Sequence, residues 1–434
     1  MQDDPRIGAV LSGGGARGAY EAGAISVLGP ALQERGERPT LFVGTSVGAF
    51  NAAYLASSRH LDAGEQAEGL LDRWREATKG NVIRPILSRQ LPLTALRYAG
   101  GLLSIPGVRV PSLLDPTPLA HSLERWMSWD DLHHNVERGP VRAVAVVATA
   151  ARTGRTVVFV ETAHELPANK SHAVRYFSTA LDNEHIRASA AIPILFPPVR
   201  VEAPAGARGW YVDGGTRLNT PIKPALDLGA DRLVVIGTES IAEPAPEPDG
   251  RDNEPPDFGD GALHALHGTL VDPLSEDMRM LGNVNEFFAG GDGASAATRY
   301  RHARGKPPYR RVPYIFIAPE RRGIVGELAS EVFRARYSGL KGLRSPDFPL
   351  LDRLLGSDSP SHGELLSYLL FDSEFIEALI DLGRADATRW LNASPGPQRP
   401  WQTEPLDAFI DAPTPKNATT PRKSPGRSRP VLGK

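Results

Sequence analysis

The sequence predicts an α/β fold with a mostly parallel central sheet, because two strand-turn-helix units follow one another near its start. The first unit comprises an apolar run at residues 6–11, the glycine turn SGGGARG and a helix-like stretch at 19–36. The second comprises TLFV at 40–43, the turn GTSVG and an alanine-rich stretch at 49–58. Repeated units of this kind place parallel strands in one sheet and helices on its faces.

Further strands are predicted where short apolar runs return later in the chain. They lie at 141–151, 155–161, 210–212, at the end of the helix-strand pair 222–238, and at 312–320. The patterns beyond residue 320 are helical to about residue 393, notably over 365–391. We therefore expect a helical C-terminal extension.

Composition divides the chain into four expected parts. Residues 6–240 hold most of the predicted strands and form the core, and 241–262 form an acidic, proline-rich insertion that cannot bury itself. Residues 263–393 supply the remaining strand and the C-terminal helices, and 394–434 form a proline-rich linker with a basic, disordered tail.

Overall composition excludes several classes of function. Among 434 residues, 41% are hydrophobic and 23% charged, and a net charge of −2 gives no field that would recruit nucleic acid. The absence of cysteine excludes disulfides, thiolate metal sites and a cysteine nucleophile. The first residues lack the pattern of a signal peptide, and no apolar run is long enough to span a membrane. We expect a cytoplasmic protein without a bound metal or cofactor.

Ser46 is the candidate nucleophile. The motif Gly44-Thr45-Ser46-Val47-Gly48 matches a nucleophile elbow, in which a serine sits on a sharp turn between a strand and a helix. A strand-like run precedes it and a helix-compatible stretch follows, so backbone N–H groups and the positive end of a helix dipole are expected near the serine. The motif alone occurs by chance in many proteins, and its context gives it weight.

A glycine-rich turn supplies candidate oxyanion donors. Gly13, Gly14, Gly15, Arg17 and Gly18 lie at the end of the first strand, where backbone without side chains can direct several N–H groups to one point. Arg17 could add charge there or pin the loop through hydrogen bonds. The same segment fits the dinucleotide-binding pattern G-x-G-x-x-G, but the next strand ends in the serine turn instead of the acidic residue that binds ribose.

Asp213, followed by Gly214 and Gly215, is the candidate base. It follows the strand-like Trp210-Tyr211-Val212, so a carboxylate emerges at a strand end where it can meet the serine. Such a base needs a weakly solvated pocket, because a free aspartate titrates near 3.9. None of the eleven histidines lies in a glycine-rich strand-end turn, and Ser46 comes too early for the usual Ser-Asp-His order.

In this order the three motifs resemble those of the patatin-like phospholipase family. The resemblance extends to the run Ala188–Pro193, to Phe196-Pro197-Pro198 and to Asn219-Thr220-Pro221. It covers residues 6–240 well. The predicted strand at 312–320 and the later helices are similar to the C-terminal part of bacterial members. DGG stands where DGA is commoner, an accepted variant. The resemblance implies a three-layer α/β/α fold, Ser46 as nucleophile, Asp213 as base, and an oxyanion site of Gly13, Gly14, Gly15 and Arg17.

The resemblance further implies a lipid or acyl-ester substrate, an acyl-enzyme intermediate, and peripheral contact with membranes. Transfer of the acyl group to an acceptor other than water would use the same residues. Residues 80–115 form the wall of an acyl channel or a membrane-facing lid, or else helices packed on the core. The alternatives are a catalytically silent lipid-binding or scaffold protein on the same fold, and a dinucleotide-dependent oxidoreductase. The sequence does not indicate an oligomeric state.

Overall fold

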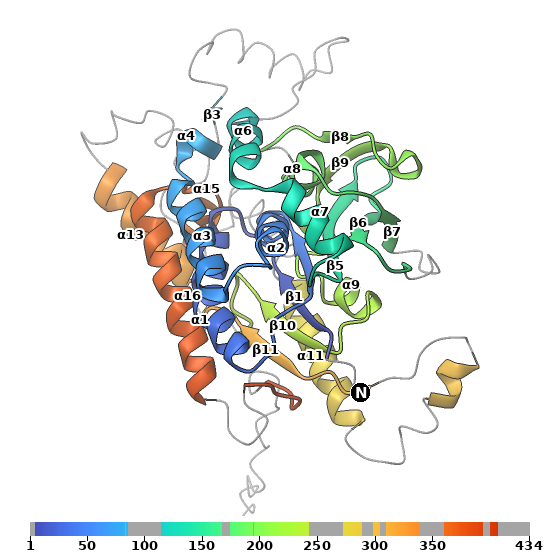
Figure 1. Cartoon of the computed structure of the whole chain (residues 1–434). Helices are drawn as coiled ribbons and strands as arrows, with labels where there is room; N and C mark the ends of the chain where they lie inside the picture. Colours follow the sequence, from blue (N-terminus) through green and yellow to red (C-terminus); the bar gives the residue numbers. More distant parts are fainter. Residues whose placement is uncertain are drawn as a thin grey trace, which may run out of the picture.

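A computed structural model of the chain describes ten stretches of it (Figure 1): residues 5–82, 84–85, 114–166, 174–193, 195–242, 272–288, 298–303, 310–337, 360–393 and 400–406. Most of the apolar stretch at 80–115, nearly all of the acidic insertion at 241–262, and the expected tail apart from residues 400–406 lie outside the described residues.

A mixed sheet runs through the centre of the molecule. Its main path is, in order, β11 (Tyr314–Ile317), β10 (Arg232–Ile236), β1 (Ile7–Leu11), β2 (Leu41–Thr45), β5 (Ala143–Ala150), β6 (Thr156–Thr162) and β7 (Val174–Ser178). The strands from β11 to β5 are parallel, whereas β6 is antiparallel to β5 and parallel to β7. The predicted mostly parallel sheet is confirmed.

Two strands extend the sheet beside the end of β5. Strand β9 (Gly209–Asp213) pairs antiparallel with the last residues of β5, and β8 (Val199–Val201) pairs antiparallel with β9. A separate two-stranded pair joins β3 (Arg84–Pro85) to β4 (Leu114–Asp115). Neither β7 nor β8 was predicted, because both runs are short and carry charged residues among the apolar ones.

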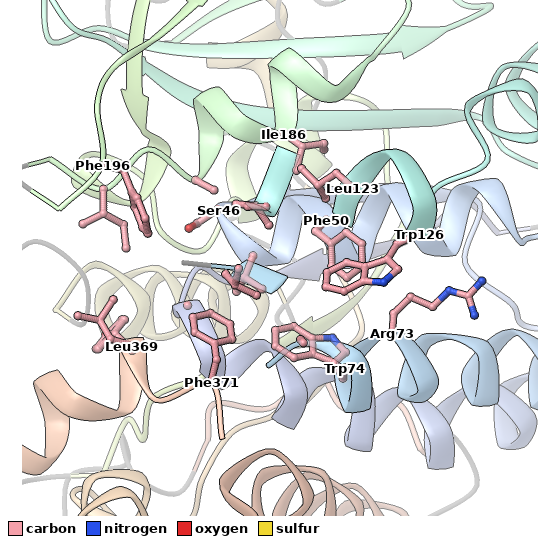
Figure 2. A pocket seen from close by; sticks show the side chains of 18 residues that line it. Ser46, Phe50, Arg73, Trp74, Leu123, Trp126, Ile186, Phe196, Leu369 and Phe371 are labelled. Atoms are coloured by element: carbon pink, nitrogen blue, oxygen red, sulfur yellow. The ribbon is translucent and has the colours of Figure 1, made fainter. Parts of the chain in front are cut away.

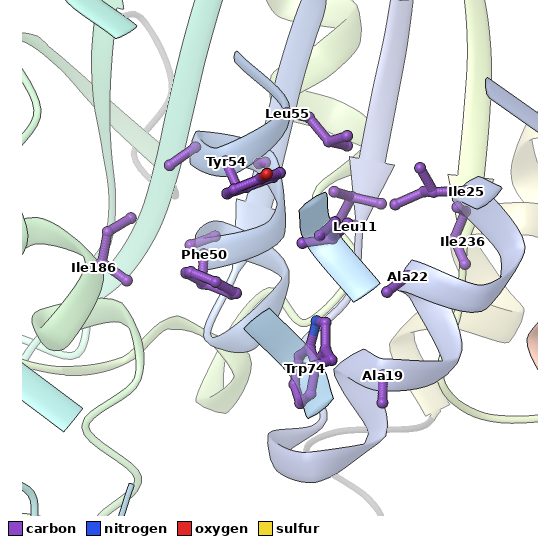
Figure 3. Close-up of a cluster of buried hydrophobic side chains, with 14 of the residues drawn as sticks. Leu11, Ala19, Ala22, Ile25, Phe50, Tyr54, Leu55, Trp74, Ile186 and Ile236 are labelled. Carbon is purple, nitrogen blue, oxygen red and sulfur yellow. The ribbon is translucent and has the colours of Figure 1, made fainter. Parts of the chain in front are cut away.

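Helices cover both faces of the sheet, which confirms three layers. Successive residues of a strand point to opposite faces: Leu11 and Phe42 join one buried cluster, and Val10 and Val43 join the other. The first cluster packs under α1 (Gly18–Glu34), α2 (Val47–Ser57), α3 (Ala63–Glu76), α6 (Thr117–Trp126), α7 (Trp129–Glu137), α8 (Asn183–Ser189), α13 (Ile324–Tyr337), α15 (Pro360–Leu369) and α16 (Ser373–Ala393). Figure 3 shows part of it, where Leu11 meets side chains of α1, α2 and α3.

The opposite cluster packs under α9 (Ile222–Asp227) and α11 (Asp272–Phe287). The remaining short helical turns are η1 (Gly15–Arg17), α4 (Lys79–Val82), η3 (Ala205–Ala207) and η4 (Gly214–Thr216). Among the described helices, none combines the length and apolar character that crossing a bilayer demands.

The C-terminal helices belong to the body of the fold. Helix α16 lies along α1 in Figure 1, and the two helices touch through glycines. A Cβ on Gly23 would lie 2.1 Å from the Ile380 carbonyl oxygen, and one on Gly383 would lie 2.1 Å from that of Tyr20.

Part of the segment expected to be a linker also contacts the body. Gln402 forms a β-bridge with Tyr314, and the buried indole of Trp401 donates a hydrogen bond to Glu37 at 2.9 Å. The described fold therefore continues beyond the expected boundary at residue 393, because the Trp401 side chain packs into the buried apolar cluster.

Candidate active site

Ser46 occupies the sharp turn between β2 and α2. It has φ 54° and ψ −123°, and among the described residues it is the one non-glycine residue with positive φ. Holding such a conformation costs about 1–3 kcal/mol. The flanking glycines leave room for the turn: a Cβ on Gly44 would lie 2.1 Å from the Gly48 carbonyl oxygen, and one on Gly48 would lie 2.4 Å from that of Leu11.

Hydrogen bonds to neighbouring segments hold this turn. The Ser46 amide donates to the Ser189 hydroxyl at 2.7 Å, and that hydroxyl donates to the Val147 carbonyl at 2.5 Å. The Thr45 hydroxyl donates to the Leu218 carbonyl at 2.9 Å. Of these bonds, the one made by Ser46 uses its backbone amide, so none of them occupies the Ser46 hydroxyl.

The strand register brings Asp213 to Ser46. The last residue of β2, Thr45, lies opposite Val147 of β5. The next residue of β5, Ala148, lies opposite Asp213 of β9. Since β6 occupies the other side of β5, β9 takes the position beside β5 that β2 vacates. Ser46 and Asp213 therefore meet where one strand ends and the other begins.

Asp213 is 4% exposed, and burial dominates its titration. Removal of the carboxylate from water raises the pKa of Asp213 to about 6, while the nearby Ser46 side chain and a hydrogen bond from the Gly215 amide, at 2.7 Å, act to lower it. This is the weakly solvated carboxylate that a serine base requires. A glycine must follow it, because a Cβ on Gly214 would lie 2.3 Å from the Val147 carbonyl oxygen.

Gly13 lies directly beside Ser46. A Cβ on Gly13 would lie 3.2 Å from the Ser46 Cβ and 2.4 Å from the Asn219 side-chain oxygen. The Gly13 amide donates to the Asn219 carbonyl at 3.2 Å, and its own carbonyl accepts from the Thr238 hydroxyl at 2.8 Å. Hydrogen bonds therefore connect the start of the glycine loop to Asn219, just before α9, and to Thr238, just after β10.

The next two amides of the loop are free to bind a ligand. In the part of the chain that the structure describes, the N–H groups of Gly14 and Gly15 donate to no protein acceptor. Gly15 has φ +57° and lines the same cavity as Ser46. A Cβ at this position would lie 2.2 Å from the Tyr368 carbonyl oxygen, so the loop fits against α15 only with glycine here.

Arg17 points into the protein, where its side chain is fully buried. Its guanidinium forms ion pairs with Glu239 and Glu364 and donates to the Ser367 hydroxyl at 2.7 Å. It also lies 4.1 Å from the centre of the Tyr368 ring. With these partners around it, Arg17 joins the glycine loop to α15, which favours the loop-pinning alternative over a direct contact with the oxyanion.

An apolar cavity opens beside Ser46 (Figure 2). Its empty space is about 680 Å³, a volume that includes solvent at its mouth. Apart from Ser46 and Arg73, its walls are almost entirely apolar or aromatic: Gly15, Val47, Phe50, Trp74, Ala77, Val82, Leu119, Leu123, Trp126, Ile186, Ala190, Ile192, Phe196, Tyr368, Leu369 and Phe371. Walls of this composition favour contact with hydrocarbon over contact with water.

None of the described residues that line this cavity is a histidine. His185, on α8, is fully buried, but its ring nitrogens contact the Asp182 carboxylate at 2.7 Å and the Ala203 carbonyl oxygen at 3.1 Å. Within the described ranges no cluster of acidic and histidine side chains is arranged to hold a metal ion.

Comparison with known families agrees with this geometry. The family model of the patatin-like phospholipases matches residues 9–226, half of the chain. The chain belongs to the patatin-like phospholipase family. Membership places it among the lipid acyl hydrolases. The matched residues include the glycine loop, the serine turn and Asp213, whereas α15 and α16 lie beyond the matched domain.

Similarity to individual proteins is distant. No curated protein matches. VipD from Legionella pneumophila shares 15% identity at a TM-score of 0.35, over 90% of this chain and 67% of that one. Human GIVD cytosolic phospholipase A2, in complex with methyl gamma-linolenyl fluorophosphonate, shares 16% at 0.38, over 91% of this chain and 58% of its own. A chain of the heterodimeric ExoU-SpcU complex from Pseudomonas aeruginosa shares 18% identity at a TM-score of 0.22, over 94% of this chain and 74% of that one.

Several residues that hold this patatin-like site were not predicted as such. Ser189 and Asn219 lie inside runs that resemble the family, but their bonds to Ser46 and Gly13 depend on tertiary contacts. Glu239 and Glu364 are ordinary acidic residues in the sequence, separated from Arg17 by more than two hundred positions. No local pattern distinguishes them from solvated carboxylates.

Proposed function

We propose that the chain hydrolyses fatty-acyl esters of lipids through a Ser46-Asp213 dyad and an acyl-enzyme intermediate. The observation that carries this proposal is the strained Ser46 turn beside a buried carboxylate, at the wall of an apolar cavity. Strained backbone conformations cluster at functional sites. A buried carboxylate with a raised pKa lowers the stability of the fold when it ionises, and such groups also cluster at functional sites.

The proposed reaction begins when the Ser46 oxygen attacks the ester carbonyl carbon and its proton passes to the Asp213 carboxylate. The carbonyl oxygen becomes an oxyanion, for which the amides of Gly14 and Gly15 are the candidate donors, because they bond to no protein acceptor in the described residues. The bond to the alcohol then breaks, and the proton moves from Asp213 to the leaving oxygen. Water attacks the acyl-enzyme, gives a proton to Asp213, and releases the fatty acid as Ser46 regains its proton.

The substrate class follows from the walls of the cavity. Hydrocarbon is transferred favourably from water to aromatic and aliphatic side chains, by about 0.8 kcal/mol for each buried methylene. A lipid acyl chain therefore suits this cavity better than a sugar, a peptide or a nucleotide would. Reaching a chain that is packed in a bilayer requires peripheral contact with the lipid surface, and we include that contact in the proposal.

A fluorophosphonate that carries an alkyl chain tests the proposal, because it phosphonylates only an activated serine. We expect stoichiometric labelling, located at Ser46 by peptide mass spectrometry, together with fatty acid release from phospholipid vesicles. A catalytically silent lipid-binding protein would instead remain unlabelled and release no fatty acid. Labelling at another serine would remove Ser46 from the proposal.

The pH dependence of the reaction should follow Asp213. Because burial raises the pKa of Asp213 to about 6, the free enzyme has an ionised base only above that pH. We expect kcat/KM for a soluble ester to rise about tenfold per pH unit below pH 6 and to level off above it. A profile already flat at pH 4.5 would mean that Asp213 is not the base.

Replacing Gly15 by alanine tests the oxyanion loop. The new Cβ would lie 2.2 Å from the Tyr368 carbonyl, so the loop must move and its amides lose their alignment. Loss of one such donor lowers kcat by about 10²–10³. Gly36→Ala is the matched control: Gly36 also has positive φ, +68°, but nothing lies within 4 Å of its Cβ position. Equal losses in both variants would indicate general destabilisation instead.

A further inference from the structure

The cavity extends to both sides of Ser46 (Figure 2). Phe196 and Leu369 lie on one side, and Phe50, Trp74 and Trp126 lie on the other, with the Arg73 side chain farthest from Ser46 on that second side. The second side is called the aromatic arm below and is defined by Phe50, Trp74, Leu123 and Trp126. It is formed by α2, α3 and α6.

Three neighbouring aromatic rings line the aromatic arm close to Ser46. Phe50 lies one helical turn after Ser46 on α2, about 6 Å along the helix axis. Its ring centre lies 5.9 Å from that of Trp126 and 6.4 Å from that of Trp74, the latter edge to face at 72°. An alkyl chain that enters the arm from Ser46 therefore meets aromatic rings from three helices.

Each indole is fixed by a hydrogen bond outside the arm. The Trp74 N–H donates to the Asn51 side-chain oxygen at 3.0 Å, and the Trp126 N–H donates to the Glu76 carboxylate at 2.8 Å. A ring held at its edge in this way swings aside only if it gives up that bond. The two indoles therefore have defined positions in the wall of the arm.

Chemistry decides which part of an ester fits here. The indole N–H groups already donate to protein acceptors, so a polar group that enters the arm gives up hydrogen bonds to water without replacing them. A hydrocarbon chain has no such hydrogen bonds to lose. The Arg73 guanidinium, the one charged group among the described residues that line the cavity, lies 5.5 Å from the centre of the Tyr54 ring at the far end. The arm suits the acyl chain and not the polar part of a lipid.

We propose that Phe50, Trp74 and Trp126 border the acyl site and set the longest acyl chain that the enzyme accepts. This inference rests on the proposed function, and it adds a specificity determinant that lies apart from the Ser-Asp dyad. It predicts that the rate rises with chain length up to a break and falls beyond it, because a longer chain must displace a fixed ring.

Alkyl fluorophosphonates of increasing chain length measure that break directly at Ser46, without needing turnover. In the wild type, the labelling rate constant should rise up to about fourfold per methylene and then fall. In Trp126→Ala, the break should move to longer chains, and the ratio of long-chain to short-chain rates should rise about sixteenfold for two added methylenes. Leu123→Ala widens the same arm and should shift the break in the same direction without removing an indole hydrogen bond.

Leu369→Ala is the matched control, since Leu369 lines the cavity on the other side of Ser46. Its break should stay at the wild-type chain length. An unchanged break in both Trp126→Ala and Leu123→Ala overturns the inference while labelling still supports the dyad. If these variants instead alter the preference for the leaving alcohol at a fixed acyl group, the arm binds the alcohol and the inference is also overturned. No labelling at any length contradicts the proposed function itself.

Discussion

Ser46→Ala is expected to lower kcat for ester hydrolysis by about 10⁶-fold, the scale of loss when a serine nucleophile is removed. Without the hydroxyl no acyl-enzyme forms, and only the oxyanion donors and substrate binding still act. The variant should fold, because the Ser189 hydroxyl accepts from the backbone amide at position 46 and not from its side chain. The measurement is a comparison of p-nitrophenyl ester turnover and of fluorophosphonate labelling with the wild type.

Ser57→Ala provides the control for this loss. Ser57 is a buried serine on the same helix, and its hydroxyl donates only to the Tyr54 carbonyl, at 2.9 Å. It should cost some stability and leave turnover close to that of the wild type. Residual activity above about one per cent in purified Ser46→Ala would assign the nucleophile to another residue.

Local sequence patterns predicted most of the sheet and the two turns of the proposed active site. Strand-turn-helix units are encoded within short windows, where an apolar run, glycines and a helix-forming stretch follow one another. The glycines at 44 and 48 are required by contacts within a few residues or with the adjacent strand, so their positions mark the turn directly. The same logic predicted a strand before Asp213, and β9 ends at that residue.

Register and long-range partners were not predictable from such windows. The sequence of residues 209–213 does not indicate that β9 pairs with the end of β5, yet that pairing brings Asp213 to Ser46. Likewise, the two carboxylates that meet Arg17 come from the segment after β10 and from α15. A residue whose role depends on a partner hundreds of positions away leaves no periodic signal in its own neighbourhood.

The apolar cavity beside Ser46 illustrates a further limit of prediction from sequence patterns. Trp74 and Trp126 lie on the apolar faces of amphipathic helices, where an aromatic residue usually fills a core. Whether such a ring packs solidly or borders a void depends on the space left between α2, α3 and α6. Sequence pattern gives the face of the helix but not that residual space, so the wall of the cavity became identifiable only in the structure.

Asp213→Asn is expected to lower kcat by about 10³–10⁴-fold, the upper range for removing a general base. Asparagine keeps the size of the side chain, and its oxygen still accepts from the Gly215 amide. It has no basic oxygen to take the Ser46 proton, so the loss is chemical. Asp227→Asn, at the end of α9, is a control outside the site: its carboxylate accepts a hydrogen bond from Tyr176 at 2.6 Å.

The same substitution should raise stability, and this separates a lost base from a damaged fold. Burial raises the pKa of Asp213 from 3.8 to about 6, so the folded state holds its proton more tightly than the unfolded chain does. The free energy of unfolding of the wild type therefore falls as the pH rises from about 4 to about 6. Above pH 6 the ionised carboxylate costs up to about 3 kcal/mol. Neutral asparagine avoids that cost.

The Tm advantage of Asp213→Asn over the wild type should accordingly be larger at pH 7.5 than at pH 4.5, where the native carboxyl is already protonated. A variant that is inactive and yet more stable at neutral pH would mean that the buried charge is kept for catalysis at the expense of stability. A variant that is inactive and less stable at both pH values would instead give Asp213 a structural role. The dyad would then need another base.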